Sequence, residues 1–321
     1  MACKKILSVL LSVSLIFVLC ACTSVQNEKK KIAVIVKATD SDFWHGVEDG
    51  VYAAATELNV SVSFSGPDNE EDYSRQNEMI RAAVEDGVNA IVLSAIDFEK
   101  NAQAVDDAVR AGVKVVTIDS GVHSNLAELF IGTDNFAAGE KAALAVSEMF
   151  SQGEPIRIGI VNCYEATANV KQREEGFRSF IETIPDAEIV DSVHVNSNTQ
   201  SAAVGSKALL QRHPEINVLV GLNEWMTLGV GTAIEQDGLS GCVHGVGFDT
   251  NTLSVDMIES GDMDALIVQN PFAIGFLGVR YAVDLLQGDT YENRDIFTDV
   301  TVVTRENLFN EDIQKILFRF Q

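Results

Sequence analysis

Short runs of β-branched and apolar residues alternate with segments of helical period along almost the whole of this chain. The runs predict strands at residues 32–36, 60–64, 90–93, 113–118, 156–161, 188–195, 218–220, 243–247, 265–268 and 300–303. The segments between them repeat apolar residues every three or four positions and predict helices at 43–58, 73–85, 102–111, 137–150, 170–184, 202–211, 226–235, 253–259 and 274–286. Strand–helix alternation of this length is typical of an α/β fold with doubly wound parallel sheets.

The alternation also contains an internal repeat. The unit from Asn89 to Asp119 and the unit from Asn217 to Asp249 each contain a buried strand, a helix and a second strand that ends in Asp. A chain of 321 residues exceeds what one core comfortably fills, so two domains are expected. Ligands of open parallel sheets bind beyond the carboxyl ends of the strands, which favours one cleft that receives both Asp side chains. The alternative is that each Asp caps the helix that follows it.

Two further segments place polar or aromatic groups at strand ends. Phe43 and Trp44 come directly after the first strand, and Gln269 follows the strand at 265–268. Aromatic faces bind the C–H faces of sugars, and amides and carboxylates bind hydroxyl groups. Core packing at the start of the helix is the alternative for the two rings. Trp225, one turn into a later helix, fits the cleft edge and the core equally well.

The N-terminus carries a secretory signal. Two lysines precede an apolar run at residues 6–19, which ends in Leu19-Cys-Ala-Cys22. This arrangement resembles a bacterial lipoprotein signal, residues 1–21, with Cys22 acylated as the first mature residue. The alternative is an uncleaved N-terminal anchor. Residues 22–31 are mostly polar and predict a flexible tether, so the remaining chain is expected outside the cytoplasm on a membrane surface.

The charge and the cysteines exclude several classes of function. The formal net charge is −24, which disfavours nucleic acid as a partner. Cys163 and Cys242 each stand in apolar, strand-like sequence and are expected to be buried thiols, with a disulfide between them as the alternative.

Motifs for catalysis and metal binding are absent from the sequence. There is no P-loop, no dinucleotide-binding glycine pattern and no nucleophile elbow, and the histidines never stand three or four residues apart. We therefore expect neither an enzyme nor a cofactor or metal. His45, beside Trp44, is expected on a helix surface rather than in the cleft. A cytoplasmic repressor with the same core is excluded, because the predicted signal stands before residue 32, where such a repressor would have a helix-turn-helix.

The chain resembles the type I periplasmic sugar-binding proteins, the ribose- and galactose-binding family of ABC-importer receptors. The segments that carry this resemblance are 42–44, 115–119, 130–135, 173–177, 213–217, 223–226, 246–249 and 268–271. The resemblance implies two Rossmann-like domains that are joined by a three-crossing hinge and clamp a sugar between them. The domains implied are 32–132 with 270–298, and 133–269 with 299–321.

The resemblance also implies the ligand contacts. Phe43 and Trp44 would stack on the sugar, and its hydroxyls would contact Asp119, Asn223, Asp249 and Gln269. Lys171 stands where ribose binders carry an arginine. The departures from ribose binders are at Ser120, Ser41 and Ser197, which are expected to be weaker ligand contacts.

The expected protein is a monomeric, lipid-anchored receptor for a neutral pentose or hexose. Because of these departures from ribose receptors, the cleft is expected to bind a sugar without being specific for ribose. Its expected partner is an ABC permease. A membrane histidine kinase that reads the same closing motion is the alternative.

Overall fold

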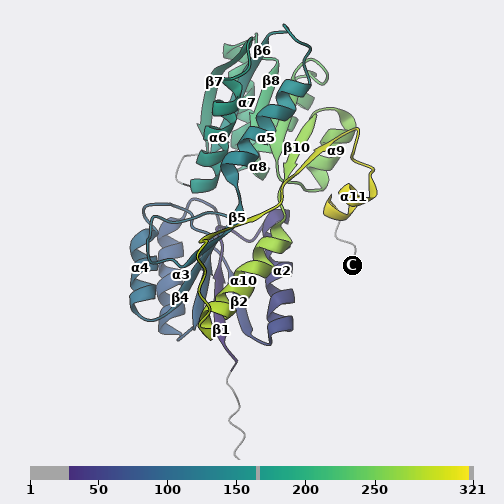
Figure 1. The fold of residues 1–321 in the computed structure, drawn as a ribbon. Helices are drawn as coiled ribbons and strands as arrows, with labels where there is room; N and C mark the ends of the chain where they lie inside the picture. The colour runs from purple at the N-terminus through teal and green to yellow at the C-terminus, as the bar shows by residue number, and fades with distance from the viewer. Residues whose placement is uncertain (1–28, 164–166, 318–321) are drawn as a thin grey trace, which may run out of the picture.

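The computed structural model describes residues 29–163 and 167–317, which form two α/β lobes around separate six-stranded sheets (Figure 1). The predicted fold class, two doubly wound lobes, is confirmed by this architecture. The predicted signal and the lipidated Cys22 lie outside the described residues. No helix within the described ranges is both long and apolar enough to cross a membrane.

The N-terminal lobe contains an all-parallel sheet covered by helices on both faces. In spatial order its strands are β11 (Asp295–Thr298), β5 (Leu129–Thr133), β4 (Lys114–Ile118), β3 (Ala90–Leu93), β1 (Lys31–Ile35) and β2 (Ser61–Ser65). One face packs against α2 (Asp42–Leu58) and α10 (Pro271–Gln287). The other packs against α3 (Tyr73–Glu85) and α4 (Ala102–Arg110). Because both faces are covered, the central strands are apolar without alternation, as in Ala90–Leu93, where every residue is buried.

The C-terminal lobe repeats this plan. Its strands, in spatial order, are β12 (Thr301–Thr304), β10 (Ala265–Val268), β9 (His244–Phe248), β8 (Val218–Gly221), β6 (Ile156–Cys163) and β7 (Ala187–Val195). Helices α5 (Asn135–Glu148) and α6 (Ala168–Ile181) cover one face. The other face is covered by α7 (Thr199–Arg212), α8 (Glu224–Gln236) and α9 (Thr252–Ser260). Strand β12 pairs antiparallel with β10, so the expectation of purely parallel sheets is wrong at this edge.

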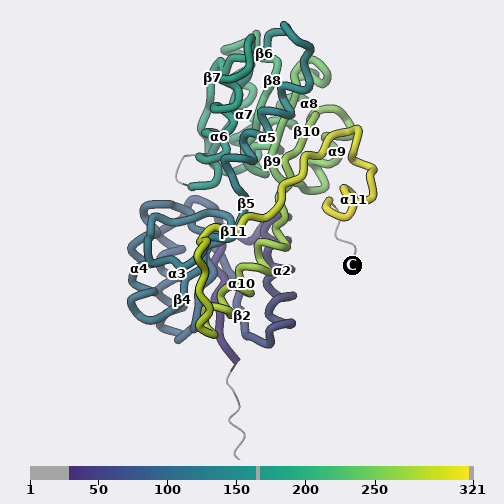
Figure 2. Tube along the Cα trace, in the orientation of Figure 1, coloured from purple at the N-terminus to yellow at the C-terminus, as the bar shows by residue number. Residues whose placement is uncertain are grey.

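The chain passes between the lobes three times, as the tube in Figure 2 shows. The crossings follow β5, β10 and β11, and the last one leads directly from β11 in one sheet to β12 in the other. We propose domain boundaries at these crossings, with 32–132 and 270–298 in one lobe and 133–269 and 299–321 in the other. Helix α11 (Glu311–Leu317), which the sequence pattern did not predict, follows β12.

Candidate functional site

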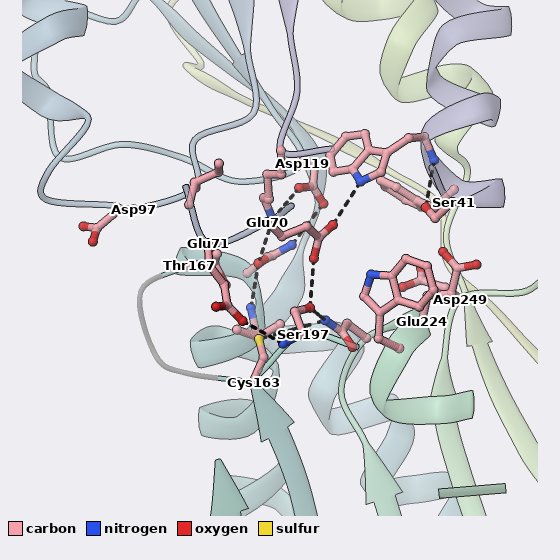
Figure 3. Close-up of a pocket in the computed structure, with 18 of the residues that line it drawn as sticks. Ser41, Glu70, Glu71, Asp97, Asp119, Cys163, Thr167, Ser197, Glu224 and Asp249 are labelled. Carbon is pink, nitrogen blue, oxygen red and sulfur yellow. Dashed lines mark hydrogen bonds and ion pairs between the residues drawn. The ribbon is translucent and has the colours of Figure 1, made fainter. Parts of the chain in front are cut away.

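A cavity of about 230 Å³ lies between the lobes, at the carboxyl ends of the central strands of both sheets (Figure 3). The sequence-predicted residues that line it are Ser41, Phe43, Trp44, Asp119, Ser197, Asn223, Asp249 and Gln269. Trp225 also lines it while packing against the core of the C-terminal lobe, so it serves as both edge and core. Of the remaining candidates, Lys171 and Ser120 are not part of the lining.

Asp119 and Asp249 occupy equivalent positions in the two lobes. Each directly follows a central strand, β4 or β9, and each has a left-handed backbone, with φ of 56° and 68° respectively. This conformation is uncommon for a residue other than glycine and is tolerated best by Asn and Asp. Neither residue is a helix cap, since strand β5 is the next element after Asp119 and the cap of α9 is Asn251. The cap interpretation is therefore wrong, and both side chains reach the shared cavity.

Asp119 is held by a buried cation and two neutral donors. The Nζ of Lys37 lies 2.8 Å from its Oδ2, and both side chains are at most 5% exposed. Ser94 donates its hydroxyl to the same oxygen, and Asn169 of the opposite lobe donates from Nδ2 to Oδ1 at 3.0 Å. The carboxylate thus belongs to a bridge between the lobes.

The carboxylate of Asp249 has fewer partners than that of Asp119. Gln269 donates from Nε2 to its Oδ1 at 2.7 Å, and Gln269 in turn accepts the hydroxyl of Thr133 at the hinge. The nearest cation is Arg173, whose Nη1 lies 3.9 Å from Oδ2. Burial raises the pKa of Asp249, and Arg173 offsets only part of that rise. One carboxylate oxygen is therefore available to a ligand.

Arg173 occupies the place in the cavity that the resemblance gave to Lys171. Lys171 is exposed on α6, whereas Arg173 is 1% exposed and lines the cavity. Its Nε donates to Asn135 and its Nη1 to the carbonyl of Leu222, which fixes the guanidinium. The Nη2 has no hydrogen-bond partner within the described chain, so it is free to donate to a ligand.

Close packing of α5 on α6 positions this arginine. A Cβ atom added at Gly139 of α5 would lie 2.1 Å from the backbone oxygen of Arg173. No residue with a side chain fits there without separating the helices, because real Cβ contacts are never so short. Glycine at this position therefore lets α6 approach closely enough to bring Arg173 under the cavity.

The aromatic wall comes from the start of α2. Ser41 caps this helix by accepting the Trp44 backbone amide, which sets the direction of both rings. Phe43 and Trp44 meet edge to face with centroids 4.9 Å apart. Both rings are buried in the core of the N-terminal lobe, and both also line the cavity. The core and cleft interpretations therefore apply to each ring at once.

A second polar bridge joins the lobes at the middle of the cavity (Figure 3). Glu70 accepts the indole N–H of Trp44 at 3.0 Å and the hydroxyl of Ser197, from the opposite lobe, at 3.0 Å. Asn223 donates to the same hydroxyl, and Glu71 accepts the backbone amide of Ser197. Burial raises the pKa of Glu70, while the nearby Lys37 opposes the rise.

Glu224 is a further buried carboxyl group in the lining. It lies at the first position of α8, is 7% exposed and accepts from Nδ2 of Asn251 at 2.8 Å. Burial is the largest cause that raises its pKa to about 7, and the neighbouring Asp249 adds to the rise.

Several residues that line the cavity were not predicted from the sequence as site residues. They are Lys37, Glu70, Glu71, Tyr73, Ile96, Asp97, Lys100, Cys163, Thr167, Asn169, Val170, Arg173 and Glu224. Lys37, Ile96 and Cys163 lie at or just beyond the carboxyl ends of β1, β3 and β6. Applying the strand-end rule to every strand, and not only to those that end in Asp, would have found these three.

Ser120, His45 and two cysteines are the other residues singled out in the sequence. Ser120 is buried beside the cavity, and its hydroxyl has no partner within the described chain. His45 is exposed, as expected. Cys163 is a buried free thiol, as predicted, but Cys242 is exposed because it lies in a turn before β9 rather than in a strand. In the described part of the chain no group of three or more His, Cys, Asp or Glu could hold a metal ion.

Comparison with known proteins agrees with this geometry. Residues 32–290 match the model of the periplasmic binding protein domain. The ribose import binding protein of Bacillus subtilis is 27% identical over 296 residues, which cover 89% of this chain and 94% of that protein. A carbohydrate transporter solute-binding protein from Agrobacterium radiobacter, solved with D-arabinose, superposes with a TM-score of 0.86 at 28% identity. The match covers 90% of this chain and 99% of that structure.

A second similar structure is the XylFII–LytSN complex. It superposes with a TM-score of 0.78 at 26% identity and covers 87% of this chain and 98% of the matched chain. The domain match alone spans most of the sequence. The chain therefore belongs to the periplasmic binding protein family, among the extracytoplasmic sugar-binding receptors of ABC transporters.

Proposed function

We propose that this protein is a lipid-anchored receptor that binds a monosaccharide, a neutral pentose or hexose as the sequence predicts, between its lobes. It delivers that sugar to an ABC importer. The observation that carries the proposal is the cavity itself, in which aromatic rings, carboxylates and amides from both lobes meet in about 230 Å³. This volume lies below the roughly 300–1,000 Å³ of pockets for drug-sized ligands and suits a single sugar ring.

The roles follow from the polarity of each wall. Phe43 and Trp44 offer apolar surface for the C–H face of the ring. Asp249 has one carboxylate oxygen to accept a hydroxyl, and the free Nη2 of Arg173 donates to a neighbouring oxygen. Asn223 and Gln269, amides with donors and acceptors, complete the set.

Closure of the lobes supplies the signal to the membrane partner. The lobes are already bridged by Asn169 to Asp119 and by Ser197 to Glu70, so the described conformation is a closed one. A ligand that contacts both walls stabilises this state over an open one, in the manner of hinge closure. The three crossings between the lobes are the segments that would bend.

A sensory role is the alternative. The similar XylFII protein forms a complex with LytSN, which supports a receptor that reports to a sensor kinase through the same closing motion. The genes beside this one distinguish the two, since a permease and ATPase favour import and a kinase with a response regulator favours sensing.

Sugar binding is tested by calorimetry with a panel of aldoses, ketoses and polyols. We expect at least one to bind with a dissociation constant well below millimolar and to be recovered unchanged. The absence of any such binding refutes the proposal, and turnover of the sugar refutes the expectation that the protein is not an enzyme.

The anchor is tested by Cys22→Ser, which should release the protein from the membrane fraction of cells. Gel filtration of the released protein checks the expected monomer. Retention of the Cys22→Ser variant in the membrane fraction would favour the uncleaved anchor.

A further inference from the structure

The charges that line the cavity are not balanced at its two ends. Lys37 neutralises Asp119 at 2.8 Å, and Lys100 lies 3.1 Å from Asp97 at the far end of the cavity. Figure 3 shows Asp97 at one end and Glu224 beside Asp249 at the other, near Ser41. Asp97 is thus paired with a lysine at its end of the cavity. The balance of charge depends on whether Glu224 and Asp249 have cationic partners at the other end.

Lys37 acts on Asp249 only from a greater distance, and within the described residues one cation lies within 4 Å of Asp249 or Glu224. It is Arg173, whose Nη1 lies 3.9 Å from Asp249 and is already donating to a backbone carbonyl. Within the described chain Glu224 has no ion pair. Its neighbours are neutral or acidic: Asn251 donates to it, Ser41 hydrogen-bonds it, and Asp249 and Asp42 repel its charge.

Two buried carboxyl groups with a single cation 3.9 Å from one of them are costly to ionise. Glu224 and Asp249 are 7% and 6% exposed, and the pKa of each is raised mainly by burial. A cationic group placed between them would relieve both the desolvation and the mutual repulsion. An aromatic side chain, Trp225, lines the same cavity and favours a cation near its face.

We infer that the cleft prefers an amino sugar, a monosaccharide with a protonated amine, and binds that amine at the Glu224–Asp249 end of the cavity. This inference rests on the proposed function and specifies its ligand class: neutral monosaccharides occupy the same cavity, and their amino counterparts bind more tightly. The net charge of −24 acts in the same direction, because it raises the local concentration of small cations.

Matched ligand pairs test the inference in the wild-type protein. D-Glucosamine, D-galactosamine and D-mannosamine are titrated beside D-glucose, D-galactose and D-mannose, with the N-acetyl forms as uncharged controls. For at least one pair we expect the amino sugar to bind about tenfold more tightly or better, the factor that about 1.4 kcal/mol gives. Its N-acetyl form should lose that advantage.

The outcomes separate the two proposals. Neutral sugars that bind as tightly as every amino partner overturn the preference and leave the sugar receptor standing. If no member of any pair, and no sugar of the wider panel, binds below millimolar, both proposals fail.

The pH dependence gives a second readout without a variant. With its pKa near 7, Glu224 must lose a proton to pair with an ammonium group, so binding of the amino sugar weakens as the pH falls. We expect the amino-to-neutral affinity ratio to fall by about tenfold between about pH 7 and pH 5.5. An invariant ratio overturns the assignment of the amine to this end.

The variant Glu224→Gln locates the effect. It should lower the amino-to-neutral ratio severalfold and flatten the pH dependence. Glu85→Gln, which removes the same charge from the exposed end of α3, should leave both unchanged. Equal effects of the two variants would attribute the preference to the overall charge of the protein and overturn the local site.

Discussion

Replacement of Lys37 by Met removes the ammonium group that neutralises a buried carboxylate. The Nζ of Lys37 lies 2.8 Å from Asp119, and the two side chains are 5% and 3% exposed. Removal of one partner of a buried ion pair typically costs about 3–5 kcal/mol, because the other charge remains buried and uncompensated. Ser94 and Asn169 still donate to Asp119, so we expect the lower part of that range, about 3 kcal/mol.

Urea denaturation followed by circular dichroism measures this loss. The double variant Lys37→Met with Asp119→Asn removes both charges and should recover most of the stability, since an uncharged pair has no uncompensated charge. An unchanged denaturant slope would show that the midpoint reports stability and not a different unfolded state.

Lys100→Met is the matched control. Lys100 lies 3.1 Å from Asp97, but its side chain is 57% exposed and its charge is screened by water. Its loss should cost about 0–1 kcal/mol. Similar losses for Lys37 and Lys100, or a double variant no more stable than Lys37→Met, would refute the reasoning that burial decides the cost.

The other predictions concern single side chains. Asp249→Ala should weaken sugar binding by about 1.5–3 kcal/mol in calorimetry. It should also lower the melting temperature of the ligand-free protein, because alanine tolerates the left-handed backbone at φ 68° poorly; a loss of stability without a loss of affinity would contradict its role in binding. Burial raises the pKa of Glu70 above 4.5, so its contribution to stability is greatest below pH 4.5 and is lost as pH rises through the raised value. The melting temperature of the wild type relative to Glu70→Gln should therefore decline over that range, and a flat or rising difference would contradict the shift. Because Cys163 is buried and its pKa is raised to about 12, a thiol reagent should label Cys242 and leave Cys163 unlabelled in the folded protein, as read by peptide mass spectrometry.

Periodicity in the sequence predicts most of the helices and strands but misses the buried strand β5 and two exposed elements, β11 and α11. The central strands are continuous apolar runs, and such runs have few alternatives in an α/β chain. Strand β11 is an edge strand whose residues alternate between exposed and half-buried, and its Phe297 is 54% exposed. Helix α11 has no buried residue. Neither β11 nor α11 has a buried apolar face, so neither has the periodic apolar pattern from which an element is predicted.

The placement of Lys171 and Arg173 shows how local geometry corrects a resemblance. Two residues along a helix differ by about 200° around its axis, so these side chains point to opposite faces of α6. The buried residues of this helix include Asn169, Val170, Arg173, Gly176 and Phe177, at the spacing of one inner face. The sequence alone thus contained the signal that Arg173, and not Lys171, faces the interior.

The burial of Lys37 and its pairing with Asp119 could not be predicted in this way. A lysine that ends an apolar strand is ordinarily exposed, because burial of an ammonium group without a partner is costly. Its partner Asp119 stands 82 positions later and ends strand β4, which is separated from β1 by β3 in the sheet. Only the order of these strands brings the two ends onto one edge, where the charges compensate each other. Strand order therefore decides which charged residues meet in the cleft. The sequence predicts a neutral ligand, and the charge distribution of the cleft is the reason to test that prediction.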